Sequence, residues 1–419
     1  MAIPTLTMIP SGYKAGKLYS ALPTNGDGDF TTTRSSSATR VNKSGLIETV
    51  ASNVPRLDYS DSSCPSLLLE SSATNLLKYS EDLSNSAWLK SSGVTVVSNN
   101  EISPNGGLNA DKAIPSTGGT FIELYQLASV TAGNEYTQTY FVKYAGLRYI
   151  QIIAPGTLGT FYVNFDLVDG VVSSSSNGNA IGLQYSIEEY AYGFYRIRVT
   201  TQALSTTTAG RLAINFIKTA TTSRGVNEGN FNGVDGVLIW GAQFEQNSLP
   251  TSYIPTTTAS VTRADERSVK SGLSDYLNGT EGVIYADIAF NATKSTNTFN
   301  SISLQDSVGD SQNLIGIFQP TTDNFLKVYM RQANATLINL QYPINATSFN
   351  KIALWYKSGD TKLFINGVLT ATITSAFTPF SLTQINYIFD NDPNYKLKDF
   401  RVYGSDLITD SFLTELTTI

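Results

Sequence analysis

The chain offers carboxylates for chemistry but has no histidine. It therefore lacks the commonest general base, the histidine-dependent Ser and Cys nucleophile systems, and most zinc or copper sites. A retaining glycosidase needs two carboxyl groups about 5 Å apart. Glu188 and Glu189 would point to opposite faces of a strand, and Asp265 and Glu266 fall in an expected linker. We therefore expect no catalytic residue and no enzymatic activity.

Calcium is the metal that best suits a chain without histidine, because it takes six to eight oxygen ligands. The carboxylates to consider lie in expected loops, and they are Asp306, Asp310, Asp390 and Asp392. Their spacing matches no EF-hand or repeat motif. The alternative interpretation, solvated acids that end turns, stays open and is favoured. No other cofactor is expected.

A single cysteine, Cys64, excludes an intrachain disulfide and a CxxC site. It lies in a polar segment before Pro65, with no recognisable cationic helix end beside it. We interpret it as a buried or half-exposed structural thiol and not as a reactive one. This cysteine usage suits a protein that is made in a reducing cytoplasm.

Aromatic side chains are the groups that could stack on sugar rings, and the chain has 23 Tyr, 20 Phe and 3 Trp. In the segment KIALWYK, alternation places Ile352, Leu354 and Tyr356 on the core face of a strand. Trp355 then lies on the outer face. We expect it to be covered by a neighbouring subunit or domain, so it is a candidate oligomer or ligand contact. Trp240, in VLIWGAQFE, is expected in the core.

Length and charge limit the function classes. A chain of 419 residues should hold two or three domains. The net charge is −6 and the pI about 4.9, which leaves no basic stripe for nucleic acid. No stretch reaches the ~18 consecutive apolar residues of a membrane span, and the N-terminus has no secretory signal pattern. We therefore expect neither nucleic-acid binding nor membrane insertion.

The elements expected along the chain are almost all strands. Short runs rich in β-branched and aromatic residues recur between Gly- and Asn-containing turns, and no helical period persists. We expect an irregular N-terminal segment at 1–73, an antiparallel β-sandwich at 74–250, a linker at 251–266 and a second sandwich at 267–419. Turns are predicted at 42–45, at 358–360 and at Asn366-Gly367. The fold class is all-β.

Three segments resemble bacteriophage tail or head fibre and spike subunits that carry lectin-like domains. They are TTTRSSSATRVNKSGLIETVASNVPRLDYSDSSCPSLLLE at 31–70, TNLLKYSEDLSNSAW at 74–88 and WGAQFEQNSLPTSYIPTTTASVTRADE at 240–266. The stretch TVVSNNEISPNGGLNADKAIPST is similar to the opening of carbohydrate-binding jelly rolls, with Trp88 just before the first long strand. KIALWYKSGDTKLFINGVLTATI resembles concanavalin A-like, laminin-G-type sandwiches, and KDFRVYGSDLITDSFLTEL adds a short helix after the last strand.

The resemblance implies a virion protein, made in the host cytoplasm, that binds host surface glycans. It implies that residues 1–73 dock onto other virion proteins of the capsid or tail, and that the subunit is a homotrimer. Two alternatives remain open: a capsid- or tail-decorating protein without a dedicated receptor site, and a polysaccharide depolymerase with paired acids in a groove. The glycan, the host and the attachment site are not indicated.

Overall fold

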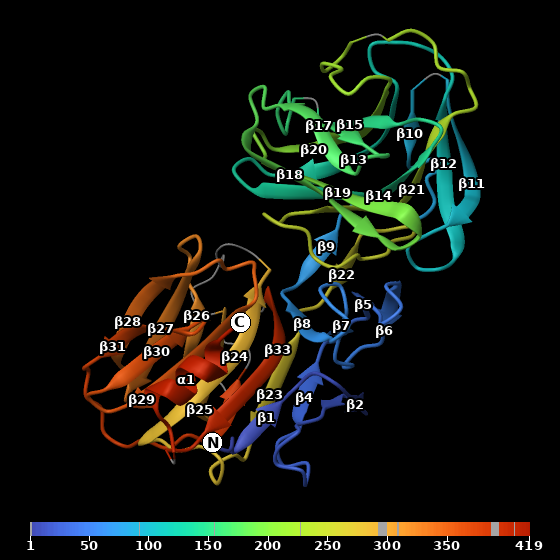
Figure 1. Ribbon diagram of the computed structural model, residues 1–419. Helices are drawn as coiled ribbons and strands as arrows, with labels where there is room; N and C mark the ends of the chain where they lie inside the picture. Colours follow the sequence, from blue (N-terminus) through green and yellow to red (C-terminus); the bar gives the residue numbers. More distant parts are fainter. Residues whose placement is uncertain are drawn as a thin grey trace. The chain divides into compact units, whose positions relative to one another are not determined.

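The computed structural model describes residues 2–91, 93–154, 156–226, 228–291, 300–307, 310–386, 394–405 and 407–419. As Figure 1 shows, it is built almost entirely from antiparallel β-sheets, which confirms the all-β prediction. The chain forms two compact units. Unit 1 contains residues 1–43, 49–72 and 264–419, and unit 2 contains 44–48 and 73–263. No helix among the described residues is long and apolar enough to cross a membrane.

Unit 2 is a sandwich of two six-stranded sheets. The β13 sheet has the order β10 (Leu89–Lys90), β13 (Glu123–Val130), β20 (Thr207–Ile217), β15 (Tyr149–Ile153), β16 (Tyr162–Asp166) and β17 (Val171–Ser176). The β14 sheet has the order β11 (Val94–Ile102), β12 (Leu108–Pro115), β21 (Gly236–Glu245), β14 (Glu135–Ala145), β19 (Phe194–Gln202) and β18 (Ile181–Tyr190). A short pair joins β9 (Ala73–Asn75) to β22 (Val261–Arg263).

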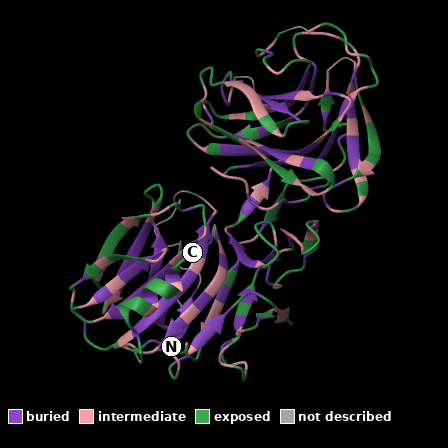
Figure 2. Ribbon diagram, in the orientation of Figure 1, coloured by how far each residue is buried: buried purple, intermediate pink, exposed green. Residues whose placement is uncertain are grey.

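The core of unit 2 lies between these sheets, because apolar residues alternate along the central strands and point inward. Ile150 and Ile152 from the β13 sheet share this core with Tyr140 and Val142 from the β14 sheet. Trp88 is also buried here, and its indole N–H donates to the carbonyl of Tyr79 at 3.0 Å. Figure 2 shows the same buried inner surfaces.

Unit 1 is a sandwich of two larger sheets. The β24 sheet has the order β31 (Val368–Ile373), β30 (Thr361–Ile365), β29 (Asn350–Lys357), β24 (Glu281–Phe290), β33 (Asn394–Tyr403), β8 (Ser66–Glu70) and β7 (Leu57–Asp58), with β1 (Leu6–Met8) also on β33. The β25 sheet has the order β2 (Tyr13–Lys14), β3 (Lys17–Leu18), β4 (Phe30–Thr33), β23 (Arg267–Ser271), β32 (Gln384–Asn386), β25 (Asn300–Ser307), β26 (Asp310–Gln319), β27 (Phe325–Gln332) and β28 (Ala335–Pro343).

The observed division of the chain differs from the expected one at the N-terminus. Residues 1–43 and 49–72 belong to the same compact unit as 264–419. Strands β1 and β8 pair with β33, and β4 pairs with β23. Their apolar side chains are part of one core; examples are Leu6, Phe30 and Leu67, all fully buried. The polar composition of 1–73 hid this role, because short strands need few apolar residues once a second segment completes their sheet.

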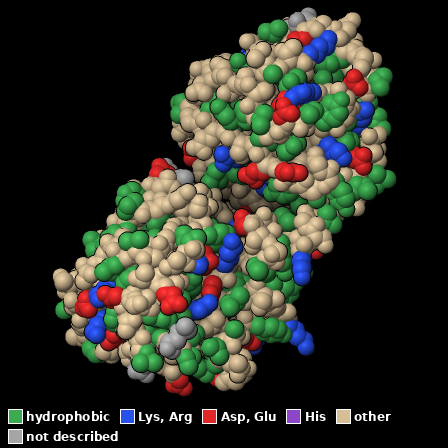
Figure 3. All heavy atoms as spheres, in the orientation of Figure 1, with side chains coloured by type: hydrophobic (Ala, Val, Ile, Leu, Met, Phe, Trp, Pro, Cys, Tyr) green, Lys and Arg blue, Asp and Glu red, His purple; other side chains and the backbone are tan. Residues whose placement is uncertain are grey.

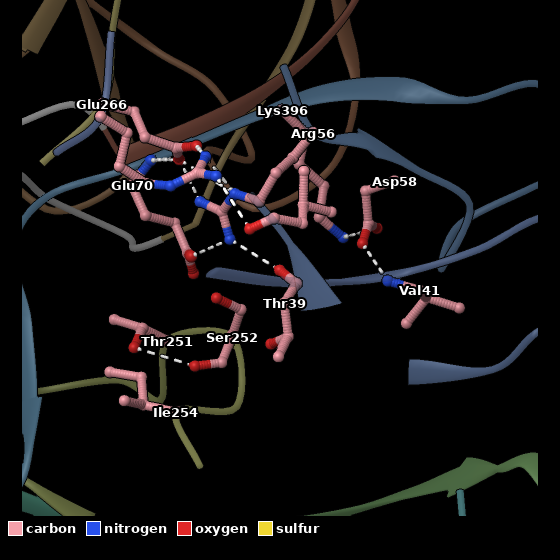
Figure 4. A network of polar contacts seen from close by, with 12 residues as sticks. Thr39, Val41, Arg56, Asp58, Glu70, Thr251, Ser252, Ile254, Glu266 and Lys396 are labelled. Carbon is pink, nitrogen blue, oxygen red and sulfur yellow. Dashed lines mark hydrogen bonds and ion pairs between the residues drawn. The ribbon is translucent and has the colours of Figure 1, made fainter. Parts of the chain in front are cut away.

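A buried ion cluster also ties the N-terminal segment to the later chain within unit 1. Figure 4 shows Arg56 between the carboxylates of Glu70 and Glu266. Its Nη1 donates to Glu70 Oε2 at 2.8 Å and to the Thr39 carbonyl at 2.9 Å. Arg34 pairs with the same Glu266. Burial opposes the charge of Arg56, but both carboxylates outweigh it and raise the Arg56 pKa.

The expected linker 251–266 is therefore not a free connection. Thr251, Tyr253 and Ile254 are buried in unit 2, and 261–263 form strand β22. Glu266, expected in the linker, lies fully buried in unit 1. The chain leaves unit 1 after Ser72 and returns to it at Ala264. These two crossings are close together in unit 1, because the Glu266 amide donates to the Glu70 carbonyl at 3.2 Å. Unit 2 is thus inserted into unit 1 through neighbouring strands.

The predicted turns are confirmed where glycine is needed for positive φ. Gly45, between β5 (Ala38–Val41) and β6 (Ile47–Val50), has φ +78°. Gly359 has φ +77° between β29 and β30, and Asn366 and Gly367 have φ +49° and +81° between β30 and β31. Positive φ at two successive residues is the requirement of a type I′ hairpin turn. The expected helix after the last strand is α1 (Asp410–Thr417).

Candidate ligand-binding face

A row of polar side chains crosses five strands on the outer face of the β13 sheet. Strand register aligns its members side by side, in the order Glu123, Asn215, Gln151, Asn164 and Ser174. Their strand neighbours, such as Leu124, Ile150 and Val163, fill the core on the opposite face. Alternation therefore puts the polar row on the side away from the core. We call it the polar row.

Amide side chains link four of the five members of the polar row, from Asn215 to Ser174, into one hydrogen-bonded chain. Asn215 Nδ2 donates to Gln151 Oε1 at 3.1 Å, and Gln151 Nε2 donates to Asn164 Oδ1 at 2.8 Å. Asn164 Nδ2 then donates to Ser174 Oγ at 2.8 Å. The three amides are buried although they leave the core face. Because buried amides need partners, the row fixes its own side-chain orientations.

A loop covers part of this face and accounts for the burial. The covering loop comprises residues 218–226 and 228–231. The Thr222 carbonyl accepts from Gln151 Nε2 at 3.0 Å, and the Ala220 carbonyl accepts from Ser174 Oγ at 2.8 Å. The loop is held internally by Glu228, whose carboxylate accepts from the Lys218 amide at 2.6 Å. The polar row thus positions the loop as well as itself.

The first position of the polar row is a charged and aromatic cluster. Glu123 is 1% exposed and forms an ion pair with Arg211. The Arg211 guanidinium lies 4.0 Å from the ring centroid of Tyr125, and that of Arg224 lies 5.3 Å from the ring centroid of Phe121. Burial raises the pKa of Glu123, while the charges of Arg211 and Arg224 act in the opposite direction.

Backbone geometry brings Arg224 to this cluster. Gly225 has φ +74°, and a Cβ built there would lie 2.9 Å from Phe121 Cζ. Glycine is required at such a close approach with positive φ. The loop therefore packs closely against Phe121, and this contact places Arg224 beside the ring. We call Phe121, Glu123, Tyr125, Arg211 and Arg224 the arginine cluster.

This arrangement has the chemical groups that bind sugars. Aromatic faces supply flat apolar surface, and charged or amide groups at their edges fix hydroxyl groups. Tyr125 and Arg211 are both partly exposed, with 34% of the Arg211 side chain accessible. Sequence reasoning missed this face, because its members come from strands about 90 residues apart, such as those of Glu123 and Arg211.

Of the four calcium candidates, only Asp306 has a side chain that the structure describes. Asp306 Oδ2 accepts from Asn313 Nδ2 at 2.7 Å, which occupies that oxygen within the sheet. The Asp310 side chain, and Asp390 and Asp392 altogether, lie outside what the structure describes. Within the described residues, no group of three or more acidic or cysteine side chains has the geometry of a metal site. Calcium binding stays a prediction.

Trp355 lies on the outer face of the β24 sheet, as its alternation with Ile352, Leu354 and Tyr356 predicts. Its cover differs from the expected neighbouring subunit. Helix α1 of the same unit packs there with Leu413, and Trp355 is 8% exposed. Figure 1 shows α1 across this sheet. The indole N–H donates to Glu281 Oε1 at 3.0 Å, so a second copy is not needed to bury it.

The structure also places the other residues that the sequence singled out. Glu188 and Glu189 are neighbours on β18 opposite Arg196 and Tyr195, so they point to opposite faces as expected. Trp240 is buried beside Tyr253, with ring centroids 4.7 Å apart, but on the outer side of the β14 sheet and not in the main core. Cys64 is exposed, which differs from the expected buried or half-exposed structural thiol.

One pair of carboxyl groups was missed from the sequence. Asp287 on β24 and Asp399 on β33 are opposite each other in register. Directly opposed residues have Cβ atoms about 4.5–5.5 Å apart. Burial raises the pKa of both groups. Asp399 accepts from Arg401 Nε at 3.1 Å, whereas the buried Asp287 Oδ1 has no hydrogen-bond partner among the described residues. Pairing of residues more than a hundred positions apart is not readable from periodicity.

Figure 3 shows acidic and basic side chains in small groups among many uncharged ones on the visible surface, which is consistent with the low charge content. No protein-family model and no curated protein matches the chain. Among solved structures it is similar to domain 4 of AbnA, an extracellular GH43 arabinanase from Geobacillus stearothermophilus, in complex with arabinotriose. That similarity has 14% identity and a TM-score of 0.29, and it covers 41% of this chain and 84% of the other.

Proposed function

We propose that the chain is a non-enzymatic adhesion subunit of a phage particle that binds host surface glycans through the outer face of the β13 sheet. The observation that carries the glycan-binding part is the stack of Arg211 on Tyr125 at the end of the polar row. A flat aromatic surface can pack against the apolar face of a sugar ring, and fixed polar groups beside it can bind the hydroxyl groups of the sugar. Weak single sites suffice when several copies act together.

The particle part of the proposal rests on the resemblance of residues 31–70, 74–88 and 240–266 to fibre and spike subunits. Docking onto capsid or tail proteins through residues 1–73 is retained, with one change. Because strands β1, β4 and β8 are integral to unit 1, docking would use the surface of that unit and not a detachable segment. A homotrimer is proposed on the same resemblance.

A depolymerase is the second candidate, and the Asp287–Asp399 pair is the observation that favours it. One feature speaks against it. Arg401 holds Asp399 through two nitrogens, at 3.1 and 2.5 Å, so that carboxylate is already engaged. A decorating protein without a receptor site is the third candidate, and it predicts no glycan affinity at the β13 sheet.

Glycan binding is tested by presenting the purified full chain to an array of bacterial surface oligosaccharides. We expect binding that Tyr125→Ala weakens by about twofold to tenfold, the factor for a lost stacking contact of about 0.5–1.5 kcal/mol. Tyr144→Ala is the matched control, because Tyr144 is 46% exposed on the other sheet of the same unit. Absence of binding, or equal loss in both variants, would remove the β13 sheet as the receptor face.

A further inference from the structure

Arg211 and Arg224 have hydrogen-bonding capacity that the protein does not use. The Nε atoms of both side chains are buried from solvent, and no acceptor reaches either one among the described residues. These Nε atoms are themselves out of a ligand's reach, but both side chains stay partly exposed, with 34% of the Arg211 side chain accessible. Their outer N–H groups can therefore donate to a ligand that supplies acceptors.

The charges of the arginine cluster do not balance. Glu123 is the only carboxylate of the cluster and it forms an ion pair with Arg211. Arg224 is close enough for its charge to act on Glu123, but it forms no ion pair of its own within the described part of the chain. Glu228 of the same loop is already engaged by the amide of Lys218 and by Thr222 Oγ1. One positive charge is therefore in excess.

Both guanidinium groups are held beside aromatic rings. Arg211 stacks on Tyr125 and Arg224 stacks on Phe121. A guanidinium group offers parallel N–H donors that match the two oxygens of a carboxylate, and stacking lowers the entropy lost on binding. The ligand that fits this arrangement is a single planar anion with an apolar ring beside it. A chain of net charge −6 does not favour a long polyanion.

We propose that Arg211 and Arg224 bind the carboxylate of an acidic sugar, so that the adhesion face selects host polysaccharides containing uronic or other carboxylated sugars. This inference rests on the proposed glycan binding at the β13 sheet. The carboxylate accepts hydrogen bonds from the guanidinium groups, and the sugar ring lies against the exposed part of Tyr125.

The experiment uses the full chain and a panel of acidic bacterial polysaccharide fragments, each paired with its carboxyl-reduced form and with a neutral sulfated fragment. We expect at least one acidic fragment to bind about tenfold or more tightly than its reduced form, a difference that falls as salt rises. Arg224→Gln should abolish the difference. Arg211→Lys should do the same, because lysine keeps the charge beside Glu123 but lacks the planar fork.

Lys112→Gln is the charge-matched control, because Lys112 lies on β12 of the other sheet. Thermal melts check that each variant is folded, and Arg224→Lys replaces Arg224→Gln if the latter is not. Equal affinity for acidic and reduced fragments would overturn the inference and leave the adhesion face intact. An acid preference that survives both arginine variants, or a preference for sulfate, would also overturn it. No binding of any fragment would remove the proposed function as well.

Discussion

Arg56 and Glu266 are 210 positions apart in the chain, yet Arg56 Nε donates to Glu266 Oε1 at 2.9 Å with both side chains fully buried. Arg34 and Glu70 complete the cluster, so two cations face two anions without access to water. The cluster joins the N-terminal strands of unit 1 to the point where the chain returns from unit 2. It makes Arg34, Arg56 and Glu70 an integral part of unit 1.

Removing one partner of this cluster should be strongly destabilising. In Glu266→Gln, Arg34 and Arg56 lose the carboxylate they share and remain buried. Breaking a buried ion pair in this way costs about 3–5 kcal/mol. Denaturant unfolding followed by circular dichroism measures the loss in unit 1. Glu188→Gln, at an exposed strand position, is the control and should change the free energy of unfolding by less than about 1 kcal/mol. A similar effect of both variants would contradict the role given to the cluster.

Removal of unit 2 should leave unit 1 folded. The Glu266 amide donates to the Glu70 carbonyl at 3.2 Å, so the two crossings lie side by side. Replacing residues 73–263 with a short Gly/Ser linker should therefore give a β-rich protein with a cooperative thermal transition. The contrasting variant lacks residues 1–73, which removes β1, β4 and β8 from unit 1, and its unit 1 should not fold. A non-cooperative melt of the first variant would show that unit 1 depends on unit 2.

Trp355→Ala should destabilise unit 1 and leave the oligomeric state unchanged. The indole fills the space beneath α1 and donates to Glu281, and truncation of such a residue costs about 3–5 kcal/mol. Denaturant unfolding and light scattering measure the two properties. Trp355→Phe keeps most of the apolar contact and should lose less. Dissociation of an oligomer without loss of subunit stability would restore the subunit-contact interpretation.

Glu81 should make the stability of unit 2 depend on pH. Burial raises its pKa, although Tyr253 and Asn109 donate to it at 3.0 Å each. The folded state then holds the proton more tightly than the unfolded chain, whose Glu pKa is about 4.3. The stabilisation that comes from this tighter proton binding is present at low pH. It is lost as the pH rises through the raised pKa of Glu81 in the folded state.

Glu81→Gln cannot ionise. Asn109 Oδ1 has no hydrogen-bond partner within the described part of the chain, so the Asn109 side chain can turn this oxygen toward the new amide. The melting temperature of the variant minus that of the wild type should therefore increase as the pH is raised from about 4 to about 7. The exposed Glu188→Gln is again the control. A difference that is constant over this range would show that Glu81 titrates alike in both states.

The purified chain should release no reducing ends from bacterial polysaccharide, because Arg401 already engages one member of the Asp287–Asp399 pair. If Asp287 and Asp399 were catalytic acids, the chain would release reducing ends, and Asp287→Asn would lower the rate of release by about 10²-fold or more. Asp265→Asn, at a partly exposed acid outside this pair, is the control. Activity lost in Asp287→Asn and kept in Asp265→Asn would establish the depolymerase alternative.

The sequence alone determined the features that depend on neighbouring residues. Alternation predicted the all-β class and the outward position of Trp355, because side-chain direction in a strand repeats every two residues. Glycine and asparagine predicted the hairpin turns at Gly45 and at Asn366-Gly367, because few other residues adopt positive φ there. Composition by itself excluded histidine-dependent catalysis, because the chain contains no histidine.

Only the tertiary structure decided which distant segments meet. Strand pairing sets the polar row and the arginine cluster, and it also brings Asp287 opposite Asp399. It shows that residues 1–43 and 49–72 belong to unit 1 and that α1, not a partner, covers Trp355. These outcomes follow from the register between strands up to several hundred residues apart. A pattern of period two fixes the face of each strand, but it contains no information about which strand lies beside it.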